Sequence, residues 1–160
     1  MTRLCSPTRL AFVICFGLWG AAAAAQPDAH GRAQASVVLE AAFTPDPHVV
    51  EVRAGGGDRN AISGNGCAGY IRNAQPTLAL TYTAGQGRLV FYVRSREDTT
   101  LLLHDADGRW HCSDDFEGSN PAIILDRPSS GRYSVWVGSY TQGAAGQPAT
   151  LYISERVPRR

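Results

Sequence analysis

The residues best suited to chemistry lie in one short stretch, Leu103–Gly118, which reads LHDADGRWHCSDDFEG. It holds four aspartates, one glutamate, two histidines and one cysteine. Counted from Glu97, seven of the fourteen acidic residues of the chain fall within twenty-one positions. A hard cation such as calcium takes about six to eight oxygen ligands, many of them carboxylates. Calcium is therefore the metal ion that this stretch favours.

The expected local geometry separates these acids into two groups. If residues 99–105 and 109–113 pair as a hairpin, Asp105 and Asp107 lie at its tip, and the next acids lie at its base. Five strand residues span roughly 16 Å at about 3.3 Å each, so the two groups do not meet. The predicted cation ligands are the acids of the base: Asp98, Asp114, Asp115 and Glu117.

A structural interpretation stands beside the cation. Asp-Ala-Asp-Gly at 105–108 is a good turn sequence, because an aspartate binds turn amides and glycine accepts a positive φ. Asp114 and Asp115 could likewise cap loop amides or pair with nearby arginines, namely Arg94, Arg96 or Arg109. Exposed pairs of this kind contribute only about 0–1 kcal/mol each, so they exist without a function.

Catalytic chemistry is less well supported by the same residues. His104, Asp105 and Ser113 supply the residue types of a serine hydrolase, but the chain has no G-x-S-x-G context. A glycosidase would need two carboxylates flanking a cleft, and no cleft is predicted. We therefore expect no enzymatic activity, with a secreted hydrolase as the alternative.

The amino terminus predicts export. Arg3 and Arg9 precede an apolar run, Leu10–Ala25, that ends in small residues, which is typical of a signal peptide over residues 1–25. The run is shorter than the ~20 residues that span a bilayer, so an uncleaved anchor is the weaker interpretation. The destination is the periplasm or the extracellular space.

Cleavage would leave 135 residues with thirteen arginines, no lysine and fourteen acids, a net charge of −1. Nucleic acids and anionic membranes call for a clustered positive excess, so neither is expected as a partner.

Cys67 and Cys112 are the two cysteines that remain after cleavage. In an exported chain such a pair predicts one disulfide, which would stabilise the fold by roughly 4 kcal/mol on the chain-entropy model. A zinc site or free thiols are the alternatives, and C-x-x-C spacing is missing.

Apolar residues recur with a period of two from about Ser36 onward, which is typical of strands with one buried face. Gly- and Asn-rich turns separate nine predicted strands, at 36–43, 48–54, 77–83, 88–94, 99–105, 109–113, 121–126, 132–138 and 149–155. Such strands predict an all-β fold, a single antiparallel β-sandwich of jelly-roll or immunoglobulin-like type over residues 36–155. Residues 26–35 and 156–160 are expected to be disordered ends.

Four strings occur in an order that resembles the pre-peptidase C-terminal-like domains of secreted bacterial proteins. They are GCAGYI at 66–71, SREDTTL at 95–101, DGRWHCSDD at 107–115 and GRYSVWVGSY at 131–140. The resemblance spans about residues 46–155. It implies a jelly-roll β-sandwich that is often appended to extracellular peptidases, sometimes binds calcium or extracellular polymers, and is not itself a catalyst.

Aromatic residues offer a second route to a partner. Trp110 and Cys112 are two positions apart in a predicted strand, so they share one face, and Trp110 is expected to pack beside the disulfide. Trp136 lies next to the apolar Val135 and Val137 in its strand, so its side chain is expected on the face opposite to theirs. Facing outward, Trp136 could join Tyr140, together with Tyr92 and Tyr152, in a stacking platform for a sugar or a protein. The alternative is that these rings fill the outer edge of the core or lie singly exposed.

Together these features predict a secreted, non-catalytic β-sandwich module, held by a disulfide and by calcium, that recognises an extracellular protein or polysaccharide. A structural or accessory protein of the cell envelope, working with a separate peptidase, is a further alternative.

Overall fold

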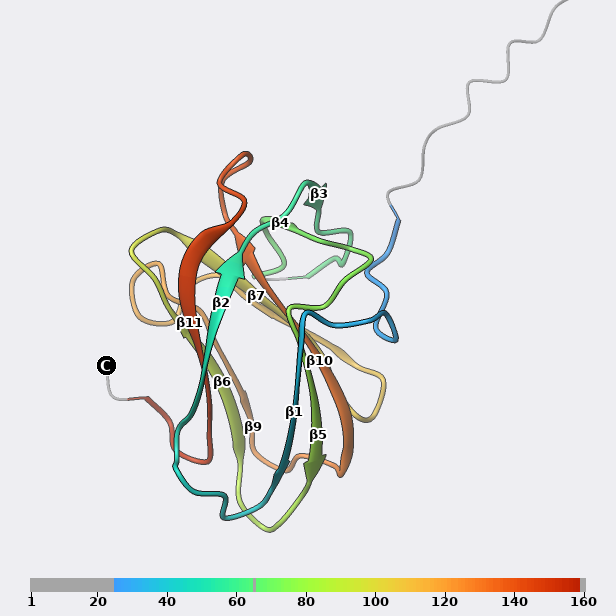
Figure 1. Cartoon of the computed structure of the whole chain (residues 1–160), viewed down its shortest axis with the longest axis vertical. Coiled ribbons are helices and arrows are strands. Elements are labelled where there is room, and N and C mark those ends of the chain that lie inside the picture. The colour runs from blue at the N-terminus through green and yellow to red at the C-terminus, as the bar shows by residue number, and fades with distance from the viewer. Residues whose placement is uncertain (1–24, 65, 159–160) are drawn as a thin grey trace, which may run out of the picture.

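The computed structural model describes residues 25–64 and 66–158, which form two β-sheets packed face to face (Figure 1). The predicted signal peptide lies almost wholly outside the described residues. None of the described residues belongs to a helix that is long and apolar enough to cross a membrane.

The larger sheet has seven strands. They are β1 (Ala35–Glu40), β5 (Leu78–Thr83), β10 (Gly131–Ser139), β4 (Tyr70–Ile71), β3 (Asp58–Arg59), β7 (Thr99–His104) and β8 (Trp110–Ser113). The long strand β10 lies at its centre and pairs with β5, β7 and β4. Strands β7 and β8 form the expected hairpin, in which Leu102 pairs with Cys112.

The smaller sheet has four strands in the order β2 (His48–Ala54), β11 (Gln147–Ser154), β6 (Leu89–Arg94) and β9 (Ala122–Leu125). All its neighbouring pairs are antiparallel. Tyr92 pairs with Tyr152 across β6 and β11, and Tyr152 pairs with Val49 of β2.

The core lies between the two sheets and follows from the period-two pattern. Every second residue of the central strands is apolar and buried, for example Leu80, Phe91, Val135 and Leu151. Burying such a side chain contributes about 1.5–3 kcal/mol relative to leaving it exposed, so this alternation determines which face of each strand turns inward.

A second, smaller cluster lies on the outer face of the seven-stranded sheet. Ile71, Leu102 and Trp136 form its centre, and Trp110 and Cys112 pack against it. Because this cluster covers the outer face of β10, Tyr133–Ser139 is buried on both sides.

The all-β sandwich and all nine predicted strands are confirmed, and β3 and β4 are additional short strands. The prediction of a wholly antiparallel sandwich is wrong at one point, because β1 runs parallel to β5. Between these two strands the chain crosses to the other sheet to form β2, so it is not forced to reverse as it would in a hairpin.

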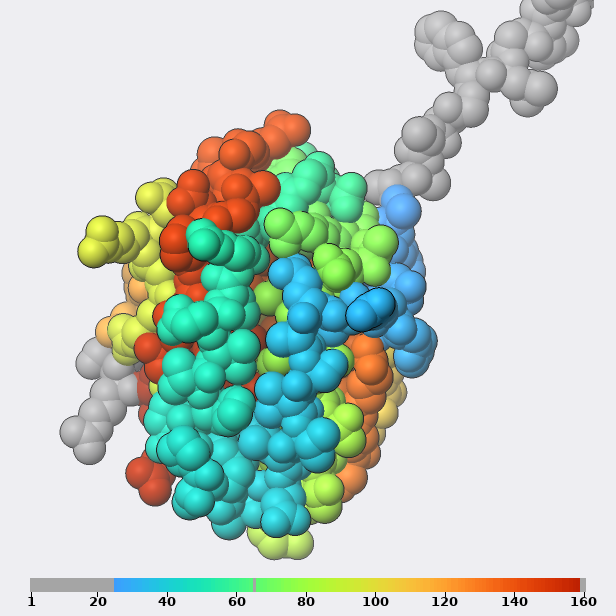
Figure 2. All heavy atoms as spheres, in the orientation of Figure 1, coloured from blue at the N-terminus to red at the C-terminus, as the bar shows by residue number. Residues whose placement is uncertain are grey.

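The prediction that residues 26–35 are disordered is also wrong. We call residues 25–34 the strap, because they lie along the edge and outer face of the seven-stranded sheet (Figures 1 and 2). The amide of Asp28 donates to the carbonyl of Asn73 at 2.8 Å, and the hydroxyl of Ser134 donates to the carbonyl of Ala29 at 2.6 Å. The position of the strap at the start of the mature chain suggested disorder, but hydrogen bonds to distant parts of the chain cannot be predicted from that position.

Candidate binding surface

The outer face of the four-stranded sheet carries the clearest candidate site, which we call the tyrosine face. Its six residues come from three neighbouring strands: Val49, Glu51, Tyr92, Arg94, Thr150 and Tyr152. Their positions alternate with core residues such as Phe91, Val93, Leu151 and Ile153, so the pleat directs them away from the core.

Tyr92 and Tyr152 stack face to face on this surface. Their ring centroids are 4.7 Å apart and the ring planes differ by 2°. Two rings lying flat side by side on a sheet could not approach so closely, so the rings stand upright on the sheet and each covers one face of the other. Burial, and then the neighbouring Tyr152, raise the pKa of Tyr92, so its hydroxyl remains a neutral hydrogen-bond donor at ordinary pH.

Val49 continues the row of apolar surface beside Tyr152 and is 48% exposed. Ala122 of β9 pairs with Tyr92 at the other end of the row. The four side chains thus form an apolar and aromatic stripe across all four strands.

A charged row runs parallel to this stripe. Thr150 pairs with Arg94 on one side and with Glu51 on the other, and its hydroxyl donates to the carboxylate of Glu51 at 3.1 Å. Arg94 extends to Glu117 at 3.1 Å, with both side chains well exposed.

An open groove of about 600 Å³ adjoins the charged row. Glu51, Arg94 and Thr150 of the tyrosine face line it, together with Arg96, Glu97 and Pro148. The groove therefore presents both signs of charge. Tyr92 and Tyr152 lie in the next row of the same sheet face, two positions along the strands from Arg94 and Thr150.

Trp136 does not belong to this surface, which corrects the prediction of an exposed platform around it. Its parity is as expected, because it points away from the main core, yet its side chain is only 1% exposed. Trp110 covers it at a ring distance of 5.6 Å, and its indole nitrogen donates to the carbonyl of Arg72 at 2.9 Å. Parity shows which face a residue occupies and not what covers that face.

Tyr140 is accessible but lies elsewhere. It follows the last residue of β10, its side chain is 50% exposed, and its amide donates to the carbonyl of Asp98 at 3.1 Å. The predicted set of four rings is thus divided among two sheets, and only Tyr92 and Tyr152 meet.

Of the four predicted calcium ligands, Asp98 has a pKa that is raised by burial and then by the charges of Asp115 and Asp114. Glu117 instead pairs with Arg94. Within the described part of the chain no group of three or more histidine, cysteine, aspartate or glutamate side chains is arranged to hold a metal ion, so calcium binding stays a prediction.

The acids at the hairpin tip have structural roles. Asp105 is 3% exposed and accepts hydrogen bonds from the amides of Asp107 and Arg109, both at 2.9 Å. The Arg109 side chain donates to it at 3.0 Å and His111 lies 2.7 Å from it. Burial would raise the pKa of Asp105, but the hydrogen bonds from His111 and Arg109 outweigh burial and lower it. The turn interpretation of these acids is confirmed.

The residues of the alternative hydrolase do not meet. His104 pairs with Trp110 at one end of the hairpin and packs edge-on against its ring at 4.6 Å. Ser113 pairs with Leu101 at the other end, and its hydroxyl accepts from the amide of Ala122 at 3.2 Å. A serine nucleophile needs its base within hydrogen-bond reach, so these two residues do not form a catalytic pair.

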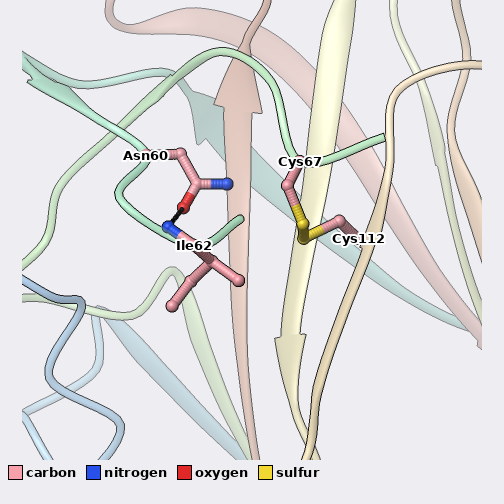
Figure 3. Close-up of a disulfide and its surroundings, with 4 residues drawn as sticks. All are labelled: Asn60, Ile62, Cys67 and Cys112. Carbon is pink, nitrogen blue, oxygen red and sulfur yellow. Dashed lines mark hydrogen bonds between the residues drawn. A yellow bond between two sulfur atoms is a disulfide. The ribbon is translucent and has the colours of Figure 1, made fainter. Parts of the chain in front are cut away.

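The predicted disulfide is present between Cys67 and Cys112, whose Cα atoms are 4.9 Å apart (Figure 3). It ties the loop after β3 to strand β8. Within that loop the amide of Ile62 donates to the side chain of Asn60 at 3.0 Å. Trp110 and Cys112 pack in the same outer cluster, as their shared parity indicates.

No family model matches the chain, and no curated protein matches it. Two solved structures are similar in fold. The pre-peptidase C-terminal domain of collagenase from Bacillus anthracis is 13% identical, with 74% of this chain and 92% of that domain covered at a TM-score of 0.41. PliG, a periplasmic inhibitor of g-type lysozyme from Aeromonas hydrophila, is 13% identical, with 75% and 97% covered at a TM-score of 0.38.

Proposed function

We propose that the chain is a secreted, non-catalytic β-sandwich module that binds an extracellular or periplasmic protein through the tyrosine face. The observation that carries this proposal is the row formed by Val49 and the stacked Tyr92 and Tyr152, which lies on the outer face of the four-stranded sheet beside an open groove. Aromatic residues and arginine are enriched where proteins bind one another.

The upright rings support a protein partner over a polysaccharide at this surface. A sugar stacks on the flat face of an aromatic ring, but here each tyrosine covers one face of the other. Ring edges, hydroxyls and the mixed charges of Arg94, Arg96, Glu51 and Glu97 instead match a polypeptide surface, which offers apolar groups and both signs of charge.

Secretion rests on the predicted signal peptide and on the disulfide. One disulfide joins the two cysteines that signal cleavage would leave, and disulfides persist in oxidising compartments. The separation of His104 from Ser113 supports the absence of serine hydrolase activity.

Affinity capture with matched variants tests the proposal. The biotinylated mature chain is incubated with the secreted and periplasmic proteins of its source, and bound proteins are identified. We expect Tyr92→Ala combined with Tyr152→Ala to lose the specific partner, and Tyr140→Ala to retain it. Tyr140 is the control, because it is an exposed tyrosine that lies off the tyrosine face.

Three results would contradict the proposal. Loss of the partner in Tyr140→Ala to the same extent would remove the tyrosine face as its site. Capture that survives protease digestion of the extract but not glycosidase digestion would identify a polysaccharide instead. Turnover of peptide or ester substrates that Ser113→Ala or His104→Gln abolishes would establish the hydrolase.

A further inference from the structure

A second cavity lies between the strap and the beginning of β10, at Arg132. We call it the strap cavity, and it has a volume of about 480 Å³. Six of its lining residues carry the argument: His30, Gly31, Arg32, Gln34, Ser36 and Arg132. All but Arg132 belong to the strap or to the first residues of β1, which Figure 2 shows in blue.

Two arginines, Arg32 and Arg132, line the strap cavity, and no aspartate or glutamate is among its lining residues. The carboxylate of Asp28 lies beside the cavity, where it accepts a hydrogen bond from the amide of His30 at 3.0 Å. Every ion pair among the described residues lies elsewhere, so neither Arg32 nor Arg132 has a carboxylate within 4.0 Å. The chain as a whole is nearly neutral, so this concentration of one sign of charge is local.

Arg132 is held in place before any ligand arrives. One of its guanidinium nitrogens donates to the carbonyl of Gly31 at 3.1 Å, which fixes the side chain against the strap. A guanidinium has five N–H donors in a planar fork, so most of them remain available. The neighbouring Ser134 also binds the strap, through the carbonyl of Ala29, so β10 orders the strap at two successive outward positions.

The remaining lining combines small residues with polar side chains. Gln34 and Ser36 supply an amide and a hydroxyl, and no large apolar or aromatic side chain lines the cavity. Its volume falls within the range of small-molecule sites, about 300–1,000 Å³. A ligand that fits such a cavity carries one or two anionic groups for the arginines and several hydroxyls for the polar side chains.

We propose that the strap cavity binds a unit of an acidic polysaccharide, with a carboxylate or sulfate group on Arg32 and Arg132 and hydroxyl groups on Gln34 and Ser36. The planar guanidinium suits both oxyanions, because it donates two parallel hydrogen bonds to them. The site is independent of the tyrosine face, which lies on the other sheet. The module would thus hold a protein on one face and a polysaccharide on the other.

Calorimetric titration of the mature chain with polymers of known charge tests this site. The probes are dextran sulfate, polygalacturonate, neutral dextran and vesicles rich in phosphatidylglycerol. We expect binding of at least one of the two acidic polymers, no binding of neutral dextran or vesicles, and weaker binding at higher salt because the charges are exposed to solvent.

Three arginine variants locate the site. Arg132→Gln and Arg32→Gln are each expected to weaken binding of the acidic polymer roughly tenfold, the equivalent of about 1.4 kcal/mol. Arg32 belongs to the strap, but its side chain makes no hydrogen bond among the described residues, so its variant separates ligand binding from the ordering of the strap. Arg88→Gln is the control, because it removes the same charge from an exposed arginine that lies just before β6 and pairs with Asp126.

Unchanged affinity in both Arg32→Gln and Arg132→Gln would overturn the proposal. An equal loss in Arg88→Gln would also overturn it, because the attraction would then be unspecific. Vesicle binding that depends on Arg132 would assign the cavity to lipid headgroups. None of these results bears on protein capture by the tyrosine face, so the two proposals fail separately.

Discussion

The carboxylate of Asp105 makes a strong test of the structure, because replacing it removes one buried group on which a whole turn depends. Its side chain is 2% exposed and accepts hydrogen bonds from two amides of the turn, from the Arg109 side chain and from His111. The substitution Asp105→Ala deletes all four at once. It leaves the turn amides and the imidazole without an acceptor.

The expected loss follows from how well each donor can return to water. Arg109 is 62% exposed and rehydrates at little cost, so it is set aside. The two amides and His111, 29% exposed, are less accessible, and a hydrogen bond to a charged group contributes about 1.5–3 kcal/mol. Allowing for partial rehydration of all three donors, we expect Asp105→Ala to reduce the free energy of unfolding by about 3 kcal/mol.

Urea denaturation at pH 7 measures this change, with Asp107→Ala as the matched control. Asp107 also pairs with Arg109, at 2.5 Å, but its side chain is 41% exposed, so we expect its loss to cost less than about 0.5 kcal/mol. Similar midpoints for the two variants would refute the reasoning, because burial would then not distinguish the two carboxylates. The pH dependence has a definite sign: the pKa of Asp105 is lowered on folding, so its contribution is complete above about pH 4 and is lost as pH falls further.

Three other measurements address the remaining features. The substitution of both Cys67 and Cys112 by serine should lower the free energy of unfolding by about 4 kcal/mol, the chain-entropy value for a loop of this length, and an unchanged urea midpoint would contradict it. Calcium should raise the melting temperature and chelation should lower it, with Asp114→Ala removing the difference; identical melting curves with calcium and with chelator would exclude the site. Burial, and then His30, lower the pKa of His104, so the unfolded chain binds more protons, and stability should fall as pH drops below about 6.5. His104→Gln should flatten this part of the pH profile, whereas a profile that only His111→Gln flattens would assign the effect to the other histidine.

The strands and the core were predictable because burial with a period of two is a local property. Leu78, Leu80 and Tyr82 alternate with smaller or polar residues, and this alone shows that one face of the strand is buried. The hairpin tip was predictable for a similar reason, since Asp105 and Gly108 act within a few residues of each other. Local chemistry of this kind depends on neighbours in the sequence.

The burial of Trp136 and the order of the strap could not be predicted from local sequence patterns. The parity of Trp136 indicates the outer face, but its burial depends on Trp110 and on the segments around Ala29 and Ile62. The last two come from parts of the chain far from Trp136 in the sequence. The strap is ordered through hydrogen bonds to Asn73 and Ser134, which lie on distant elements.

The amino-acid sequence by itself determined the strand positions, the two faces of each strand and the two cysteines that pair. It did so because alternation, turn chemistry and cysteine count do not depend on how the sheets are assembled. Only the tertiary structure decided which outward side chains stay accessible and which become neighbours. The stacking of Tyr92 on Tyr152 and the gathering of Arg32 with Arg132 depend on strand order and on the path of the strap. Both contacts join residues that are far apart in the sequence, so they depend on which distant segments pack together to bury the most apolar surface.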